Sequence, residues 1–191
     1  MRRTTVAAII TAGLLLTATA CTGDEITSTP SKTGAAEAPA EKAEPEAEPA
    51  KATVAKTGDT ITLKGTEDGL KVDAVLKKWD DNAQPGDEYT EASAGKRFVA
   101  AQFELTNTGT APYADSPANG AQAADADGQR FSSTIAEVAN GPAMTSDANV
   151  PPGEKVLGWI VFEVPKASEI VTVQLALDSG FANQTGQWKV S

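Results

Sequence analysis

Cys21 is the residue whose chemistry the sequence indicates most directly, because it is the only cysteine in the 191-residue chain. It follows the small residues 17–20, which follow an apolar run over residues 6–16 and two arginines near the start. A basic start, a short apolar middle and a small-residue exit are the layout of an export signal. A cysteine directly after such a signal can be acylated, and a diacylglyceryl group supplies two chains, enough for stable membrane attachment. We therefore expect residues 1–20 to be a signal peptide and Cys21 to anchor the protein to the membrane.

An alternative for this segment stays open. The acceptor motif of bacterial lipoproteins prefers leucine three positions before the cysteine, where this chain has Ala18, whereas Thr19 and Ala20 fit the next two positions. An ordinary secretory signal cleaved after Ala20 would give the same pattern. In that case the protein would be secreted without an anchor, whereas acylation of Cys21 would hold it on the extracellular face of the membrane.

The residue types that are missing exclude several classes of chemistry. The chain has no histidine, so it has no Ser-His-Asp or Cys-His arrangement and no histidine-ligated zinc or haem. Paired carboxylates could hydrolyse glycosides, but such a site needs aromatic platforms, and aromatic residues make up only 5% of the chain. The net charge of −10 opposes nucleic-acid binding. We expect no enzymatic activity, no catalytic residue, no cofactor and no nucleic-acid partner.

Two acidic segments are candidate cation sites. Asp125-Ala126-Asp127-Gly128 begins like an EF-hand loop, but the fifth, sixth and twelfth positions hold Gln129, Arg130 and Ala136, so a tight turn is predicted instead. Residues 80–91 form an acidic loop that could hold calcium weakly or be a solvated connection between strands. Its acidic and amide residues are Asp80, Asp81, Asn82, Asp87, Glu88 and Glu91. No metal site is assigned, and cation binding by this loop is left open.

Aromatic residues near the acidic loop suggest a contact patch. Trp79 is predicted at a strand end beside the loop, and Tyr89 and Tyr113 could join it, since Trp and Tyr dominate protein–protein hot spots. Trp159, by contrast, lies in a run that is apolar on both faces, so it is predicted to pack in the core.

The chain divides into three parts. Residues 21–56 follow the signal and are predicted to be a disordered tether, because the segment repeats Ala, Glu and Pro and has almost no large apolar side chain. Residues 57–191 alternate apolar and polar residues with a period of two, which is typical of half-buried strands. The run Val99, Ala101, Phe103, Leu105 and the run Val171, Val173, Leu175, Leu177 are examples.

Short strands in about 130 residues, separated by Gly, Pro, Asn and Asp, predict an all-β fold, an antiparallel β-sandwich. Residues 155–164 are apolar on both faces and are predicted to form a central strand, with Gly158 at a bulge or a close approach by a bulky neighbour. Asn107 and Gly109 are predicted to turn the chain with positive φ.

Two segments carry a resemblance to a known family. Residues 95–109 (GKRFVAAQFELTNTG) and residues 150–165 (VPPGEKVLGWIVFEVP) resemble, in their order and spacing, an uncharacterised immunoglobulin-like domain family of lipoproteins from Gram-positive bacteria. That family is similar in fold to a secreted immunoprotective antigen. The resemblance covers residues 57–191 and implies an immunoglobulin-like sandwich and export, but it implies no activity and no site residue.

The anchor, the tether and the lack of catalytic side chains favour a non-enzymatic interaction module at the cell surface. Its partners would be the membrane, through the lipid on Cys21, and another envelope protein. The alternative is a binding protein for a small ligand or a cation such as calcium, which should have a pocket with converging polar groups.

Overall fold

The computed structural model describes residues 55–191, so the predicted signal peptide, Cys21 and nearly all of the tether lie outside the described residues. Ala55 and Lys56, which the sequence assigned to the tether, form the first strand and pair with the last one. The elements in chain order are β1 (Ala55–Lys56), β2 (Thr60–Lys64), β3 (Lys71–Ala83), β4 (Lys96–Asn107), β5 (Tyr113–Asp115), η1 (Pro117–Gly120), β6 (Ala121–Asp125), β7 (Arg130–Thr134), β8 (Ala148–Val150), β9 (Lys155–Pro165), β10 (Ile170–Ala176), η2 (Asp178–Gly180) and β11 (Thr185–Lys189).

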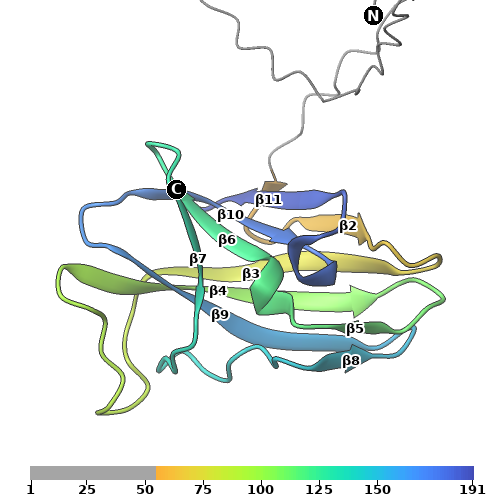
Figure 1. The fold of residues 1–191 in the computed structure, drawn as a ribbon, viewed down its shortest axis with the longest axis horizontal. Coiled ribbons are helices and arrows are strands. Elements are labelled where there is room, and N and C mark those ends of the chain that lie inside the picture. The colour runs from red at the N-terminus through yellow and green to blue at the C-terminus, as the bar shows by residue number, and fades with distance from the viewer. Residues whose placement is uncertain (1–54) are drawn as a thin grey trace, which may run out of the picture. The chain divides into compact units, whose positions relative to one another are not determined.

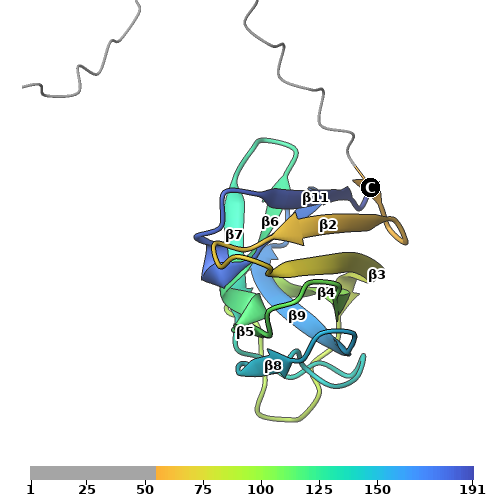
Figure 2. The same ribbon diagram turned by 90° about the vertical axis from the view of Figure 1, so that its right-hand side faces the viewer.

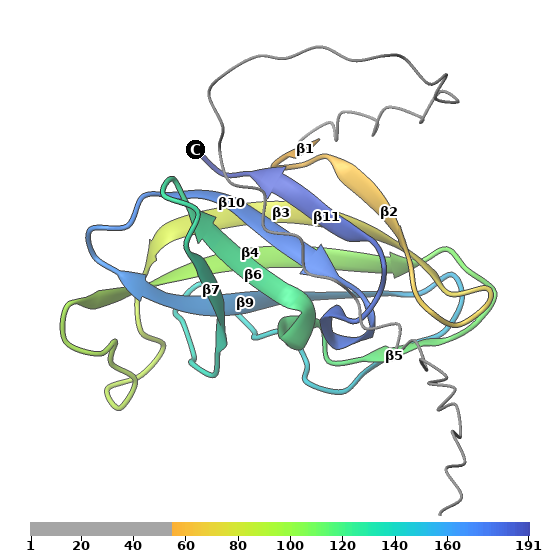
Figure 3. The ribbon, with the colours of Figure 1, turned by 45° about the horizontal axis from the view of Figure 1, so that its top comes forward.

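The strands form two layers, which confirms the predicted β-sandwich. One layer has the order β2-β3-β4-β9 and the other β1-β11-β10-β6, with β7 hydrogen-bonded to β6 on one side and to β9 on the other. Figure 3 shows β6, β10 and β11 crossing in front of β3, β4 and β9. All pairings between these strands are antiparallel except that of β1 with β11. Since β7 serves both layers, the sandwich is closed along that side (Figure 1).

The core lies between the layers and follows the predicted alternation. Val99, Ala101, Phe103 and Leu105 of β4 are all fully buried. Phe103 meets Trp188 of the opposite layer edge to face, with ring centroids 5.3 Å apart, a favoured arrangement for aromatic pairs. β9 is paired with β4 along its whole length, which confirms that it is a central strand.

One face assignment in β10 is wrong. The alternation placed Val171 on the same face as Val173, but the pairing with β6 shifts between Ile170 and Thr172. Ile170 therefore points into the core with 3% exposure, while Val171 is half-buried. A bulge reverses the alternation at the point where it occurs, and the sequence pattern alone carries no mark of it.

The turn at residues 107–109 is present, but its predicted backbone conformation is wrong: neither Asn107 nor Gly109 has a positive φ. Gly109 is required for space, because a Cβ atom there would overlap the backbone oxygen of Gly69. Asn107 is buried, and its side chain binds three backbone groups.

The predicted close approach at Gly158 is confirmed, but the neighbour is backbone. A Cβ atom on Gly158 would lie 2.6 Å from the nitrogen of Met144, too close for a real contact. The chain at residues 142–144 runs beside β9, with Met144 N–H donating to Trp159 O at 2.8 Å and Trp159 N–H to Pro142 O at 3.0 Å. This segment extends the sheet on the edge of β9 that β7 leaves free.

A second apolar cluster lies on the outer face of the β2-β3-β4-β9 layer. It contains Ala83, Phe98, Ala100, Val138, Trp159 and Val161, and we call it the outer cluster. Two long connections cover it, and they are joined by hydrogen bonds from Gly86 N–H to Glu137 O and from Ala139 N–H to Gln84 O, each 2.9 Å. Trp159 therefore packs beneath these loops and not in the main core between the layers.

Candidate functional site

The aromatic residues predicted to form a contact patch are not brought together as one surface. Tyr113 is 1% exposed and belongs to the main core, so its inclusion in the patch is wrong. Its hydroxyl donates to Asp115 Oδ2 at 3.3 Å, and burial raises the pKa of Tyr113 above its ordinary value. Trp79 packs half-buried against the main core, whereas Tyr89 is 87% exposed on the loop after β3.

The acidic segment begins inside β3, and several of its carboxylates bind protein groups. Asp80 Oδ2 accepts from Asn140 Nδ2 at 2.6 Å, and Asp81 is paired with Arg97 at 2.9 Å. Asp87 Oδ1 accepts the N–H groups of Tyr89 and Thr90, and these hydrogen bonds lower the pKa of Asp87. Among residues 55–191, no group of three His, Cys, Asp or Glu side chains could hold a metal ion.

The predicted turn at Asp125–Gly128 is confirmed. Buried Asp125 accepts the N–H groups of Asp127 and Gln129 through Oδ1, at 3.1 and 2.8 Å, and Gly128 has a φ of +84°. The aspartate that suggested a calcium ligand therefore closes the β6–β7 hairpin.

The open half of the outer face of the β2-β3-β4-β9 layer collects basic side chains. Lys64 and Lys71 lie opposite each other in the β2–β3 register, and Lys155 lies one row away, opposite Thr106. The register of β3 shifts between Leu76 and Lys78, so that both Lys77 and Lys78 face outward: Lys77 reaches Glu104, and Lys78 lies opposite Gln102. We call Lys64, Lys71, Lys77, Lys78 and Lys155 the lysine face.

Two carboxylates lie among these five lysines. Glu104 accepts from Lys155 at 2.9 Å and lies 3.7 Å from Lys77, and the bond from Lys155 is the main cause of its lowered pKa. Asp73 accepts from Thr62 Oγ1 at 2.6 Å. Lys64, Lys71 and Lys78 form no ion pair with any described residue. The face is thus locally basic on a chain of net charge −10.

The centre of this face is partly apolar. Val75, Glu104 and Leu157 lie in one cross-strand row, and Leu157 is 49% exposed. An apolar centre with a polar rim is common to protein–protein contact surfaces, and Leu157 with the polar side chains around it has this arrangement.

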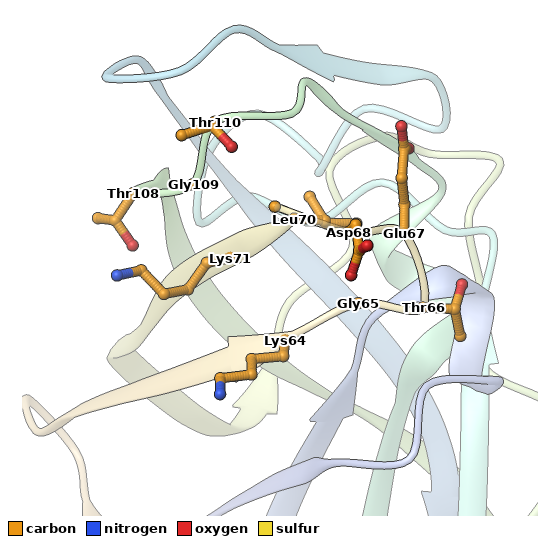
Figure 4. Close-up of a pocket in the computed structure, with 11 residues that line it drawn as sticks. Lys64, Gly65, Thr66, Glu67, Asp68, Leu70, Lys71, Thr108, Gly109 and Thr110 are labelled. Atoms are coloured by element: carbon orange, nitrogen blue, oxygen red, sulfur yellow. The ribbon is translucent and has the colours of Figure 1, made fainter.

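A shallow hollow of about 430 Å³ lies at the end of the lysine face, between the β2–β3 hairpin and residues 108–110. Figure 4 shows Lys64 and Lys71 pointing to one side of the hairpin, away from Glu67 and Asp68 at its tip. Like charges directly opposite each other on paired strands destabilise a sheet, so this pair is a local cost to the fold.

A larger cavity of about 570 Å³ opens along the edge of β9. Its floor is formed by Trp159, Ile160 and Val161. One wall is the end of β7 with residues 135–137, the other is the returning chain at residues 143–146, and η1 closes one end. Asp87 and Thr90 complete the lining. Figure 2 shows the β2-β3-β4-β9 layer from its end, with β9 beside β5 and β8.

Sequence reasoning missed both surfaces. The outward positions of Lys71 and Asp73 agree with alternation in β3, but the bulge that turns both Lys77 and Lys78 outward has no sequence signal. The cavity is lined from five separate segments, so no local pattern could predict it.

Within residues 55–191, no helix has the length and apolar character needed to cross a membrane.

Comparisons with solved structures give the same fold. The chain is similar to the secreted protein MPT63 of Mycobacterium tuberculosis, with 16% identity, a TM-score of 0.53 and coverage of 72% of this chain and 96% of that one. It is also similar to the predicted lipoprotein ycdA of Bacillus subtilis, with 13% identity, a TM-score of 0.53 and coverage of 72% of this chain and 39% of that one. The yjhA protein of Bacillus subtilis gives 13% identity and a TM-score of 0.53, with coverage of 72% and 100%. At these identities the likeness establishes the fold alone.

A comparison with curated proteins finds no match. The profile of one family matches residues 56–186, which is most of the chain and nearly all of the described domain. That match includes both segments on which the resemblance was based, residues 95–109 and 150–165. The chain therefore belongs to the family described as a domain of unknown function, DUF4352.

Proposed function

We propose that this protein is an exported, lipid-anchored and non-enzymatic interaction module whose lysine face binds an acidic envelope protein outside the cell. The export signal pattern before Cys21 supports the location. The similar proteins MPT63, which is secreted, and ycdA, a predicted lipoprotein, support it further.

The residues of the domain support a binding function over catalysis. The chain has no histidine, and the carboxyl groups of residues 55–191 whose pKa is shifted, Asp87, Glu104 and Glu163, all have a lowered pKa. A carboxyl group that donates a proton during hydrolysis needs a raised pKa, as in glycosidases. These carboxyl groups stay ionised at neutral pH and serve as hydrogen-bond acceptors.

The lysine face is the observation that carries the proposal. Its three lysines without ion pairs and the exposed Leu157 lie on the same outer face, so an acidic surface that also carries an apolar group complements it. Such a partner would also relieve the repulsion between Lys64 and Lys71, which the isolated domain retains.

The anchor is tested with Cys21→Ser. Loss of the thiol should release the protein from the membrane into the medium, and mass spectrometry of the parent protein should show the lipid on Cys21. A parent protein with an unmodified thiol at this position would refute the anchor and leave the secreted alternative.

The docking surface is tested by placing a photo-crosslinking amino acid at Leu157 in cells. We expect an adduct whose crosslinked peptide in the partner is rich in Asp and Glu, and we expect its yield to fall in the triple variant Lys64→Gln, Lys71→Gln, Lys78→Gln. A matched control, Lys166→Gln with Lys189→Gln, removes basic charge elsewhere and should leave the yield unchanged. Equal yields in both variants, or adducts with lipid alone, would refute the docking surface.

A further inference from the structure

The dipeptide Asn-Gly occurs twice in the chain, at Asn119-Gly120 and at Asn140-Gly141, and an alanine precedes it in both places. Asparagine before glycine is prone to a spontaneous reaction, in which the backbone nitrogen of the glycine attacks the side-chain amide carbon of the asparagine. Glycine favours this reaction because it has no Cβ atom to hinder the ring that forms. Since both tripeptides read Ala-Asn-Gly, a large difference in their reactivity would come from the fold.

The first of the two sites is tightly held. Asn119 and Gly120 end the short helix η1, and Asn119 N–H donates to Ser116 O at 3.0 Å. Gly120 is buried, and a Cβ atom there would overlap the backbone oxygen of Ala176. The Gly120 nitrogen therefore cannot move toward the Asn119 side chain unless these contacts break.

The second site is open. Asn140 and Gly141 are both exposed, and they lie in residues 135–147, the connection from β7 to β8, which we call the covering loop. The Gly141 N–H is held by a long hydrogen bond of 3.5 Å to Val138 O. Apart from its chain neighbours, the atom nearest to a Cβ on Gly141 would be Trp159 Nε1, at 3.4 Å, so this corner is not crowded. The reacting pair is thus open to solvent and its backbone is loosely held.

We infer that Asn140 is a modification site, at which the protein converts its own asparagine to an acidic residue. The Gly141 nitrogen loses its proton to water or hydroxide, bonds to Asn140 Cγ and closes a succinimide ring. The bond from Cγ to Nδ2 breaks, and Nδ2 takes up a proton and leaves as ammonia. Water then opens the ring, at Cγ to give aspartate or at the backbone carbonyl carbon of residue 140 to give isoaspartate. The sum is asparagine plus water giving an acidic residue plus ammonia, so water is the sole co-reactant.

The product changes a contact that fixes the covering loop. Asn140 Nδ2 donates to Asp80 Oδ2 at 2.6 Å, and this bond joins the loop to β3. Conversion removes the donor and places a second carboxylate against Asp80, so that an attraction becomes a repulsion between like charges. Isoaspartate also inserts the side-chain CH₂ into the backbone close to Pro142, whose carbonyl oxygen accepts from Trp159 N–H. Either product loosens the loop that covers the outer cluster. The site is separate from the lysine face, so it does not depend on the proposed function.

The site is tested with the purified protein kept at alkaline pH, where more of the backbone nitrogen is deprotonated. Trypsin separates the two asparagines, because it cuts after Arg97, Arg130 and Lys155 and so releases the peptides 98–130 and 131–155. Mass spectrometry with fragmentation then identifies the converted residue. We expect Asn140 to convert at least about tenfold faster than Asn119 in the folded protein, because Asn119 must wait for local opening. In urea the two rates should differ by less than about twofold, because the unfolded chain no longer protects Asn119.

Variants test the consequence for the covering loop. Asn140→Asp reproduces the product that has a normal backbone, and it should speed hydrogen exchange at Ala139 N–H, which donates to Gln84 O, by about fivefold or more. Adding Asp80→Asn restores a donor opposite the new carboxylate, so the double variant should exchange as slowly as the parent. Asn140→Gln is the control for the chemistry, because its longer side chain closes a ring far more slowly, and it should gain no acidic form at this position.

Three outcomes overturn the inference. If Asn140 converts no faster than Asn119 in the folded protein, or if neither converts, the fold does not single out this site. If Asn140→Asp exchanges like the parent at Ala139, conversion does not loosen the covering loop. If the double variant exchanges as fast as Asn140→Asp alone, repulsion from Asp80 is not the cause.

Discussion

Asn107 offers a sharp test of how the end of β4 is held, because its buried amide binds backbone groups of two neighbouring segments there. Its Nδ2 donates to Ala111 O at 2.9 Å and to Val150 O at 2.8 Å, and its Oδ1 accepts from Gly109 N–H at 3.0 Å. Asn107→Ala removes all three hydrogen bonds and leaves Ala111 O and Val150 O without this donor, whereas Gly109 N–H still donates to Lys71 O. At about 1 kcal/mol for each hydrogen bond lost, the variant should lose about 3 kcal/mol of unfolding free energy.

Urea denaturation measures this loss. With a slope of about 2 kcal/mol per M, the midpoint should fall by about 1.5 M. Asn149→Ala is the matched control, because Asn149 is exposed on β8 directly before Val150, and it should change the unfolding free energy by less than about 0.5 kcal/mol.

A second variant separates hydrogen bonding from shape. Asn107→Asp keeps the side-chain volume but replaces the donor with a carboxylate that faces two carbonyl oxygens, so the charged form is disfavoured in the fold. Its instability should therefore be greatest at neutral pH and should diminish as the pH falls and the carboxyl group becomes protonated. If Asn107→Ala loses less than about 1 kcal/mol, the three hydrogen bonds do not hold this end of the sandwich, and the reasoning is refuted.

Three further predictions concern other positions. Gly158→Ala should cost about 2 kcal/mol in urea unfolding, because its methyl group would push residues 142–144 off β9, and parent-like stability would contradict the close approach. Glu163 has its pKa lowered to about 2, first by the N–H of Ser93 and then by Lys96, so its ionised form stabilises the fold above about pH 4.5 and this is lost as the pH falls toward 2. Glu163→Gln should reduce the pH dependence of the melting temperature over that interval. An unchanged pH dependence would show that Glu163 does not contribute to it. Asp125→Ala should cost about 2 kcal/mol and speed hydrogen exchange at Gln129 N–H, whereas unchanged exchange would mean that the turn holds without the carboxylate.

The strands and their faces could be predicted from the sequence because alternation is local. The alternate apolar residues Val99, Ala101, Phe103 and Leu105 are all buried, as their pattern predicts. The prediction was wrong at Val171, because one extra residue in the pairing of β10 with β6 reverses which side chains face the core at the start of β10. That error is physical in origin, since a bulge is set by the partner strand and not by the bulged residues alone.

Tyr113 shows a different limit. Its short strand β5 has only three residues, too few for an alternation pattern that would have placed the side chain in the core. Burial comes from β8, which pairs with β5 although 32 residues lie between Asp115 and Ala148. The cavity beside Trp159 was beyond the sequence for the same reason, because its lining depends on where five separate segments meet.

The pairing of β1 with β11 has a mechanical consequence. β1 contributes two residues, and its two pairs with Trp188 and Lys189 are the first interactions of the domain in chain order. A force that pulls on the chain before Ala55 would therefore act on these two residue pairs before it acts on the longer β2–β3 pairing. These two pairs would break first and lengthen the chain before the domain by two residues, while the rest of the sandwich stays folded. β1 would therefore absorb a small extension before the stable part of the domain bears the force.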